Sequence, residues 1–326
     1  QSYFRDLLSI SLFCIIFVHN GTEEFGIMKK RILIVGSNGF TGRRILETLA
    51  QEPDFLVTGT SLHPDCCPQG SGYSFVVSDM TDGEALERLF DKVWPEVVIN
   101  TAALSVTDYA ENHRDEADAV NVEAVARLAR ACEARKARFI HLSTDFVFSG
   151  DTRRLYTEED VPAPVNYYGK TKWESEKQVA IWCRNYAVVR VVVVYGNPLP
   201  GQHGNIVTLV ANRLRNGEAV RVVNDQWRTP VYVDDVVQGV RKLMDYPGNG
   251  IFHICGEECL SIADIAFRVA DVLGLDRSLI HPVSTEEMQE KTPRPRFSGL
   301  SIEKAKRELG YRPRTLEEGI RCMFPE

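Results

Sequence analysis

The sequence predicts an α/β fold, in which a doubly wound parallel sheet with helices on both faces is followed by a smaller C-terminal α/β lobe. Short apolar, β-branched runs alternate with helical segments between residues 31 and 195, which is the order of a parallel sheet with crossover helices. Beyond Pro198 this regular alternation loosens. We therefore assign residues 28–195 mainly to the sheet domain. Residues 196–326 form mainly the smaller lobe, and some of its segments are expected to return to the sheet.

The composition is that of an ordinary globular protein. A chain of 326 residues is long enough for a sheet domain and a second lobe. The net charge of −7 and the lack of a long basic run argue against nucleic acid as a partner. The eight cysteines show no paired metal-ligand spacing, so we expect no metal and reduced thiols, as in a cytoplasmic protein.

The first 27 residues differ from the rest of the chain. Residues 7–18 are mostly apolar, but this stretch is shorter than the ~20 residues that a membrane-spanning helix needs. Arg5 is the only positive charge near it, and no small-residue cleavage site of a signal peptide follows. We interpret residues 1–27 as an extension outside the folded core, which begins at Met28, and we expect no membrane as a partner.

A glycine-rich turn joins the first predicted strand (residues 31–35) to the first predicted helix (residues 43–50). In a G-x-x-G-x-x-G spacing, the first glycine permits a tight turn and the second lets backbone N–H groups approach a pyrophosphate. The third lets the helix pack closely on the strand. This context predicts a Rossmann-type dinucleotide site rather than a structural turn without a ligand. The predicted cofactor contacts here are Gly36, Asn38, Gly39, Phe40, Thr41 and Gly42.

The second strand (residues 55–61) indicates which dinucleotide is bound. NAD-selective enzymes usually carry an acidic residue at the end of this strand, where it holds the ribose 2′-hydroxyl. Here the strand ends in Thr60-Ser61, and Arg43 at the start of the first helix suits a 2′-phosphate. We therefore prefer NADP(H) and keep NAD(H) as the second choice. The alternative role for Arg43 is a solvated charge on the helix.

The ends of the next two strands supply further cofactor contacts. The strand at residues 74–77 leads to Asp79 and Met80; the Asp79 carboxylate either accepts from the adenine amino group or caps the following helix (residues 83–92). The strand at residues 97–100 is followed by small residues that let the backbone come close to the cofactor. These are Thr101, Ala102 and Ala103.

Candidate catalytic residues lie on the following elements. The helix at residues 116–133 contains Asn121, and the strand at residues 139–144 ends in Thr144 and Asp145. In the helix at residues 167–183, Tyr168 and Lys172 project from one face a turn apart. A neighbouring ammonium and a helix N-terminus, here capped by Asn166, both favour the phenolate and so predict a lowered tyrosine pKa.

The remainder of the chain is predicted to form further strands and helices. An apolar run at residues 187–196 reads as one long buried strand. In the smaller lobe, the guanidinium forks of Arg228 and Arg294 suit a diphosphate. Solvated surface arginines are the alternative. Predicted helices cover residues 204–216, 234–244, 261–273 and 301–309, and predicted strands cover residues 220–223 and 250–254.

With the glycine triplet, residues 100–103, residues 143–145 and the Tyr168/Lys172 pair in this order, the chain resembles the extended short-chain dehydrogenase/reductase superfamily over residues 29–326. Within that superfamily it looks most similar to the dTDP-4-dehydrorhamnose reductase (RmlD-like) family. The stretches that support this are residues 105–111, 143–148, 164–172 and 224–226, and the dipeptide Arg294-Pro295.

The resemblance implies NADPH-dependent reduction of a 4-keto-6-deoxy sugar attached to a nucleotide, as in dTDP-rhamnose and cell-surface polysaccharide synthesis. It implies that Tyr168 protonates the carbonyl oxygen, that Lys172 holds the nicotinamide ribose, and that Thr144 hydrogen-bonds the same carbonyl oxygen. Asn121 matches the helix asparagine that supports a proton-relay water. Thr144, Asp145, Arg228 and Arg294 are expected to contact the nucleotide sugar. Family habit further implies a homodimer in the cytoplasm.

Two departures from the family pattern keep alternatives open. The family usually has a tryptophan after the position of Arg190, where this chain has only valines at residues 191–194. The segment at residues 300–311 looks more like that of nucleotide-sugar epimerases and dehydratases. The alternatives are therefore such an epimerase or dehydratase, or a non-catalytic NADP-binding subunit similar to the regulatory β subunit of methionine adenosyltransferase.

Overall fold

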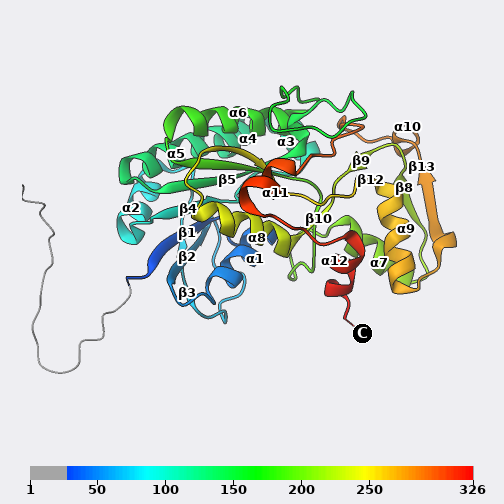
Figure 1. Cartoon of the computed structure of the whole chain (residues 1–326), viewed down its shortest axis with the longest axis horizontal. Helices are drawn as coiled ribbons and strands as arrows, with labels where there is room; N and C mark the ends of the chain where they lie inside the picture. The colour runs from blue at the N-terminus through cyan, green and yellow to red at the C-terminus, as the bar shows by residue number, and fades with distance from the viewer. Residues whose placement is uncertain (1–27, 326) are drawn as a thin grey trace, which may run out of the picture.

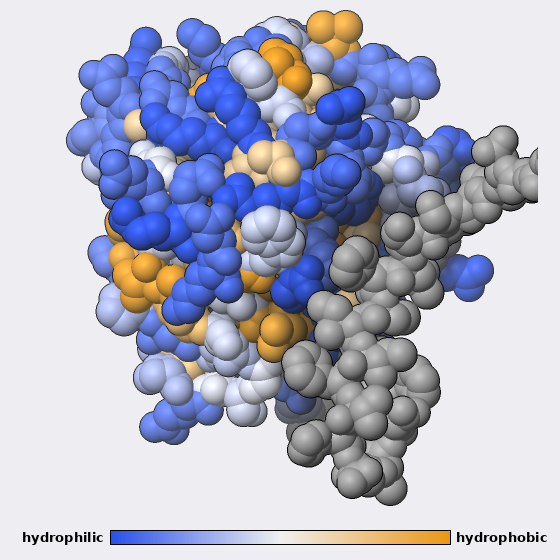
Figure 2. Space-filling view, turned by 90° about the vertical axis from the view of Figure 1, so that its left-hand side faces the viewer, coloured by the Kyte–Doolittle hydropathy of each residue, from blue (hydrophilic) through white to orange (hydrophobic). Residues whose placement is uncertain are grey.

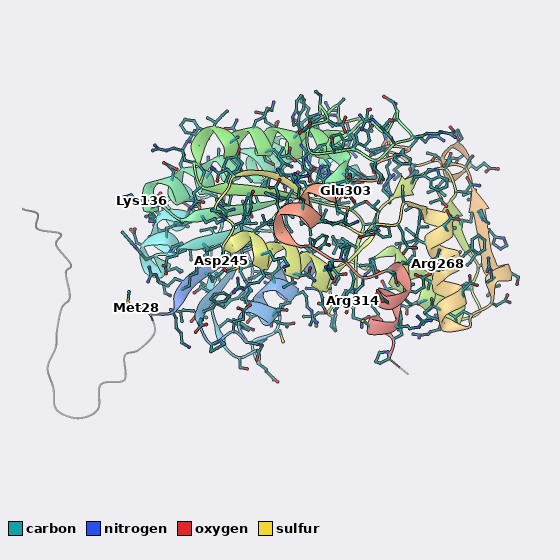
Figure 3. The ribbon with its side chains drawn as sticks, in the orientation of Figure 1. Met28, Lys136, Asp245, Arg268, Glu303 and Arg314 are labelled. Carbon is teal, nitrogen blue, oxygen red and sulfur yellow. The ribbon has the colours of Figure 1, made fainter. Side chains whose placement is uncertain are left out.

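The computed structural model describes residues 28–325, so the predictions for residues 1–27 lie outside the described residues. A sheet domain and a smaller lobe lie side by side along the long axis of the molecule (Figure 1). Met28 and Arg268 lie toward opposite ends of this axis (Figure 3). The predicted α/β class, with a doubly wound parallel sheet, is confirmed.

The central sheet has seven strands in the order β11-β6-β5-β4-β1-β2-β3, and every neighbouring pair is parallel. The order reverses between β1 and β4, which is where parallel sheets of this kind bind ligands. Strand β11 comes from the C-terminal part of the chain and pairs with β6. The strands are β1 (Lys30–Val35), β2 (Phe55–Ser61), β3 (Tyr73–Val77), β4 (Val97–Asn100), β5 (Arg138–Thr144), β6 (Tyr186–Val191) and β11 (Gly250–His253).

Alternate residues of β1 belong to different cores, because successive side chains of a strand point to opposite faces. Ile32 and Ile34 pack with α1 (Phe40–Leu49) and α8 (Val233–Met244), and α11 (Glu303–Leu309) joins this layer. Leu33 and Val35 pack on the other face. That face is covered by α2 (Gly83–Val93), α5 (Ala124–Arg135) and α6 (Tyr167–Trp182).

The smaller lobe has its own core between helices and a short parallel pair of strands. Arg268 forms ion pairs with Glu258 and Glu317 and so links two of its helices. Its strand pairs are β8 (Val220–Val223) with β13 (Ile280–Val283), β9 (Trp227–Arg228) with β12 (Leu260–Ser261), and β10 (Val231–Tyr232) with β7 (Val194–Tyr195). Its helices are α7 (Ile206–Arg215), α9 (Ile262–Leu273), α10 (Thr285–Met288) and α12 (Leu316–Met323).

Two predicted elements are interrupted. The strand predicted at residues 187–196 divides into β6 and β7, because Val193 has φ +40°, a left-handed conformation that strains a β-branched residue. The helix predicted at residues 116–133 comprises α4 (Arg114–Asp118), a π-helical turn η1 (Ala119–Glu123) and α5. The short helix α3 (Thr107–Asn112), β13, α10 and α12 were not predicted.

The surface of the sheet domain at the N-terminal ends of its strands is mostly hydrophilic, and its apolar side chains lie in small separate groups (Figure 2). None of the helices within residues 28–325 combines the length and the apolar content that crossing a bilayer requires.

Candidate active site

The turn between β1 and α1 has the geometry of a dinucleotide-binding turn. Gly36 has φ +81°, and a Cβ there would lie 2.5 Å from the backbone nitrogen of Ala102. A Cβ at Gly42 would lie 2.4 Å from the carbonyl oxygen of Gly36. Gly39 is the N-cap of α1 and has no side chain to accept from the first-turn N–H groups. These groups therefore remain available for an anion such as a pyrophosphate.

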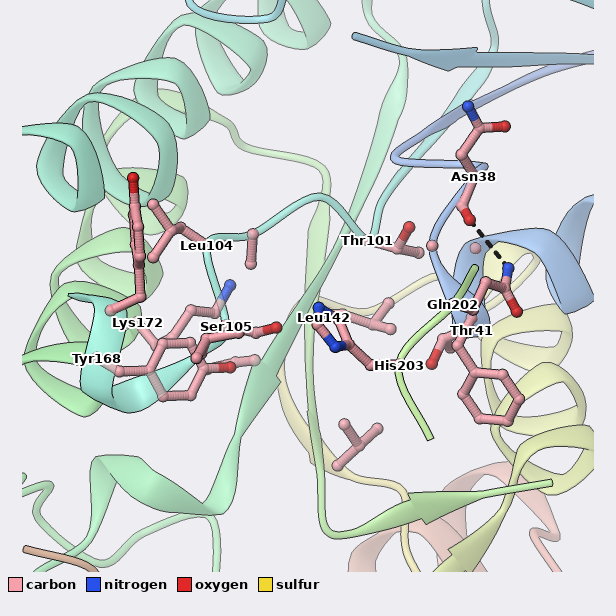
Figure 4. Close-up of a pocket in the computed structure, with 18 of the residues that line it drawn as sticks. Asn38, Thr41, Thr101, Leu104, Ser105, Leu142, Tyr168, Lys172, Gln202 and His203 are labelled. Atoms are coloured by element: carbon pink, nitrogen blue, oxygen red, sulfur yellow. Dashed lines mark hydrogen bonds between the residues drawn. The ribbon is translucent and has the colours of Figure 1, made fainter. Parts of the chain in front are cut away.

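Two cavities meet at this turn. The tyrosine cavity, of about 590 Å³, extends from the turn to Tyr168 and Lys172 (Figure 4). The β3-side cavity, of about 320 Å³, extends from the turn toward the end of β3. Together they are lined by every predicted cofactor residue except Arg43: Gly36, Asn38, Gly39, Phe40, Thr41, Gly42, Asp79, Met80, Thr101, Ala102, Ala103, Tyr168 and Lys172.

Other lining residues were not predicted. The stretch from Leu104 to Tyr109 contributes to the tyrosine cavity, and its position directly after residues 101–103 was the signal that could have identified it. Gln202 and His203 reach the same cavity from the loop before α7, and Gln202 donates to the carbonyl oxygen of Asn38 at 2.9 Å (Figure 4). No pattern in the sequence indicates that this loop crosses to the glycine turn.

Tyr168 lies in the first turn of α6, as predicted, because the Asn166 side chain caps that helix by accepting from the N–H of Gly169 at 2.8 Å. The prediction of a lowered pKa was wrong. Burial raises the pKa of Tyr168, the nearby Asp145 carboxylate adds to this, and a hydrogen bond with Thr144 opposes it. Tyr168 is therefore a protonated phenol at neutral pH, which is the form that a proton donor needs.

Lys172 is 2% exposed and lies one turn along α6 from Tyr168. Burial lowers the pKa of Lys172 to about 8, and the Glu176 carboxylate opposes that shift. The Nζ atom of Lys172 is 3.2 Å from Nε2 of His141, a fully buried residue of β5. The lysine amine is therefore in contact with the imidazole ring of His141, a residue that the sequence did not single out.

Asp145 and Arg228 form a buried ion pair beside Thr144, with 3.5 Å between Oδ2 and Nε. Asp145 also accepts from Thr144 Oγ1 at 3.1 Å and from the Ser298 hydroxyl. Arg228 donates as well to the side chain of Gln226 and to two backbone carbonyl groups. Both residues were predicted to bind substrate, but the structure commits much of their hydrogen-bonding capacity to protein partners.

A third cavity, the lobe cavity of about 520 Å³, lies between the sheet domain and the smaller lobe. Arg228 and Arg294 both line it, so the structure brings these two predicted residues together. Arg221 and Lys291 add positive charge to its wall. The valines in place of the expected tryptophan lie between the two cavities: Val191 lines the tyrosine cavity and Val193 the lobe cavity.

Four predicted residues line none of these cavities: Thr144 and Asp145, whose contacts are given above, and Arg43 and Asn121. The Arg43 guanidinium is buried and bonded to Glu47, Asp65 and the hydroxyl of Tyr73. Together with the carbonyl oxygen of Cys67, these partners take four of its five N–H groups, and Arg43 does not line the β3-side cavity. Asn121 lies in the π-helical turn, where its amide bonds both backbone groups of Leu104 and the hydroxyl of Thr171. Asn121 thus holds the cavity wall instead of facing the cavity.

Known proteins resemble this chain over nearly its whole folded length. The model of the RmlD substrate binding domain family matches residues 29–326. A probable low-salt glycan biosynthesis reductase from Haloferax volcanii is 32% identical over 89% of this chain and 96% of its own length. The methionine adenosyltransferase 2 subunit beta of Bos taurus is 31% identical over 90% of this chain and 86% of its own length. The crystal structure of dTDP-4-dehydrorhamnose reductase from Bacillus anthracis in complex with NADP superposes with a TM-score of 0.79 and 26% sequence identity. The superposition covers 91% of this chain and 99% of the B. anthracis chain.

Proposed function

Because the chain belongs to the RmlD substrate binding domain family, we propose that it reduces a nucleotide-linked 4-keto-6-deoxy sugar with NADPH. At the level of enzyme class, the chain is an NAD(P)-dependent oxidoreductase of the short-chain dehydrogenase/reductase type and a sugar-nucleotide reductase. The observation that best supports the proposal is that one cavity connects the glycine turn to Tyr168 and Lys172. We further propose that the protein acts in the cytoplasm and assembles as a homodimer.

The residues at the glycine turn fit a dinucleotide. Gly36 and Gly42 leave no room for a Cβ, and the N-terminus of α1 lacks a side-chain cap. A nicotinamide cofactor bound there would supply the hydride. NADP(H) is the preferred cofactor, as in the similar B. anthracis reductase, and NAD(H) is the second choice.

Tyr168 donates the proton in the proposed reaction. Its raised pKa keeps the phenol protonated until negative charge develops on the carbonyl oxygen. The Thr144 hydroxyl, which now donates to Asp145, turns to the same carbonyl oxygen and stabilises that charge. Lys172, when protonated, stabilises the phenolate that Tyr168 becomes.

The lobe cavity supports a nucleotide diphosphate as the carrier of the sugar. Arg221, Lys291 and Arg294 line it, and guanidinium groups bind phosphate oxygens in pairs. Phe146 lines the same cavity and lies next to Thr144 and Asp145, so a sugar extending from this cavity would reach Tyr168. The phosphates and the keto group would thus be recognised by different lobes of the protein.

The tyrosine cavity favours a reductase over a dehydratase. Dehydration of a sugar needs an acid for the leaving hydroxyl and a base for the neighbouring carbon, in addition to the groups that exchange the hydride. Within residues 28–325, neither an aspartate nor a glutamate lines this cavity. Asp108, which directly precedes Tyr109, lines the lobe cavity instead, and Asp145 is held by Arg228 and Ser298. A net reduction requires a proton donor and a group that stabilises its anion, and Tyr168 and Lys172 line this cavity.

A non-catalytic NADP-binding subunit is the second candidate. The observation that favours it is the 31% identity to the methionine adenosyltransferase 2 subunit beta over 90% of this chain. A regulatory subunit would bind NADPH without consuming it. The two candidates therefore differ in turnover and not in cofactor binding.

The deciding experiment follows the near-ultraviolet absorbance of NADPH after mixing with dTDP-, UDP- and GDP-linked 4-keto-6-deoxy sugars. Consumption by the wild type and its loss in Tyr168→Phe support the reductase. The matched control is Tyr167→Phe, because the Tyr167 hydroxyl bonds Asp118 and does not line the tyrosine cavity. NADPH binding without consumption of NADPH for any of these sugars would favour the regulatory candidate instead.

A further inference from the structure

His141 and Asn100 form a hydrogen-bonded pair behind the catalytic lysine, and both are fully buried. On one side of the imidazole ring, Nε2 is 3.2 Å from Nζ of Lys172 and 2.9 Å from Oγ of Ser175. On the other side, Nδ1 is 3.1 Å from Nδ2 of Asn100. The mechanism proposed above assigns no role to these two residues.

The backbone after β4 determines which ring nitrogen of His141 carries the proton. The Asn100 Oδ1 atom accepts from the N–H of Ala102 at 3.1 Å, and a backbone N–H can only donate. The Asn100 NH₂ group therefore faces His141 and donates to Nδ1, which must hold a lone pair. In the neutral ring the proton is then on Nε2. Burial lowers the pKa of His141 well below its ordinary value, and the charge of Lys172 adds to this, so the ring stays neutral.

The Nε2–H group consequently faces Ser175 and Lys172. The Ser175 hydroxyl gives its single proton to the carbonyl oxygen of Lys172 at 2.6 Å, so toward His141 it can only accept. An ammonium has no lone pair and cannot accept from Nε2–H, whereas a neutral amine can. The contact with His141 therefore favours the neutral form of Lys172, in the same direction as the lysine's lowered pKa.

We propose that His141 is a positioning residue for Lys172: held by Asn100 as the Nε2–H form, it opposes protonation of the lysine amine at the wall of the tyrosine cavity until cofactor binding draws the amine away as an ammonium. The inference rests on the proposed function, because it assumes an anionic nicotinamide cofactor in this cavity. The other ionisable groups near Lys172 on α6 are Glu176, whose carboxylate favours the lysine charge, and Tyr168, which lines the same cavity. Arg190 of β6 is paired with Glu176 at 2.6 Å.

The first test is the protonation state of His141 in the cofactor-free protein, measured from the ¹⁵N chemical shifts of its ring nitrogens. The expected result is a protonated Nε2 and an unprotonated Nδ1 that persist across neutral pH. A protonated Nδ1, either as the other tautomer or as an imidazolium, would overturn the proposal. This measurement uses the wild-type chain and does not depend on any variant folding.

The second test is the dissociation constant of NADPH, followed by its fluorescence from about pH 7 to about pH 10. If binding converts Lys172 to an ammonium, one proton is taken up and the wild-type affinity falls by up to about tenfold per pH unit above about pH 8. In His141→Phe the fall should begin at higher pH than in wild type, although the burial of Lys172 keeps the onset below the ordinary lysine pKa. An onset unchanged from wild type would refute the proposal.

His253→Phe is the matched control for this titration. His253 is an equally buried histidine of the same sheet, but its ring contacts Arg190 and the carbonyl oxygen of Ser301 instead of Lys172. His253→Phe should lose stability as His141→Phe does, but its NADPH affinity should begin to fall at the same pH as in wild type. If this pH shifts equally in both variants, His141 has only a structural role. Neither readout uses a sugar substrate. Failure to reduce any nucleotide sugar would therefore count against the proposed function alone.

Discussion

The Asp145 carboxylate lies 3.5 Å from the Arg228 guanidinium, and both side chains are less than 5% exposed. This pair joins the end of β5, beside Thr144, to strand β9 of the smaller lobe. Burial raises the pKa of Asp145 and Arg228 opposes that shift, so the carboxylate depends on this partner for its charge. The two lobes of the protein are thus connected by an ion pair adjacent to Thr144.

Loss of Arg228 should destabilise the fold strongly, because the Asp145 charge would remain buried without its ionic partner. We expect Arg228→Met to lower the free energy of unfolding by about 3–5 kcal/mol, as measured by urea denaturation. The double variant Asp145→Asn/Arg228→Met should recover much of that loss, since no charge is then left unpaired. Additive losses in the double variant would show that the pair is not coupled.

Removal of the Tyr168 hydroxyl should abolish most turnover. We expect Tyr168→Phe to lower kcat by about 10²–10⁴-fold, the usual contribution of a positioned proton donor, while the dissociation constant of NADPH changes little. Tyr167→Phe should retain nearly full kcat, because that hydroxyl bonds Asp118 outside the cavity. Equal kcat values for the two variants would remove Tyr168 from the proton-donor role.

Arg43 should support the cofactor loop without selecting between the two nicotinamide cofactors. Its bonds to Asp65 and Tyr73 hold the segment that connects β2 to β3, and partners within the protein take four of its five N–H groups. We therefore expect Arg43→Leu to raise KM for NADPH and for NADH by similar factors and to lower Tm. A rise confined to NADPH would instead show that the arginine leaves these partners to bind the 2′-phosphate.

Lys172 should make stability depend on pH in the alkaline range. Its pKa of about 8 in the folded state is below the ordinary lysine value, so between these two pH values the unfolded chain binds more protons than the folded chain. Stability contributed by this group therefore rises with pH from about pH 8 toward pH 10. We expect Lys172→Met to be more stable than wild type at neutral pH.

The stability difference between Lys172→Met and wild type should shrink by a few kcal/mol as the pH rises from about 8 toward about 10. The measurement is urea denaturation of both proteins at several pH values, with Lys170→Met as the control, because Lys170 is an exposed lysine of the same helix. A difference between Lys172→Met and wild type that stays constant with pH would show that Lys172 is an ammonium throughout.

The sequence by itself determined those parts of the protein whose partners are close along the chain. The glycine turn, the N-cap of α6 by Asn166, and the strands β2, β4 and β8 lie where the residues predicted, because glycine spacing, capping and β-branched runs act within a few residues. The same local rules placed nearly all predicted cofactor residues along the two cavities at that turn.

Only the tertiary structure decided the charge states and pairings at the site. Asp145 pairs with Arg228, Lys172 contacts His141, and Arg43 pairs with Asp65. In each case the two residues lie on different segments of the chain that pack together in the fold. Burial then outweighs the local field of the helix, so the pKa of Tyr168 rises where the sequence predicted a fall. The physical reason is that desolvation depends on everything packed around a group, whereas helix capping and residue spacing depend only on its neighbours in the chain.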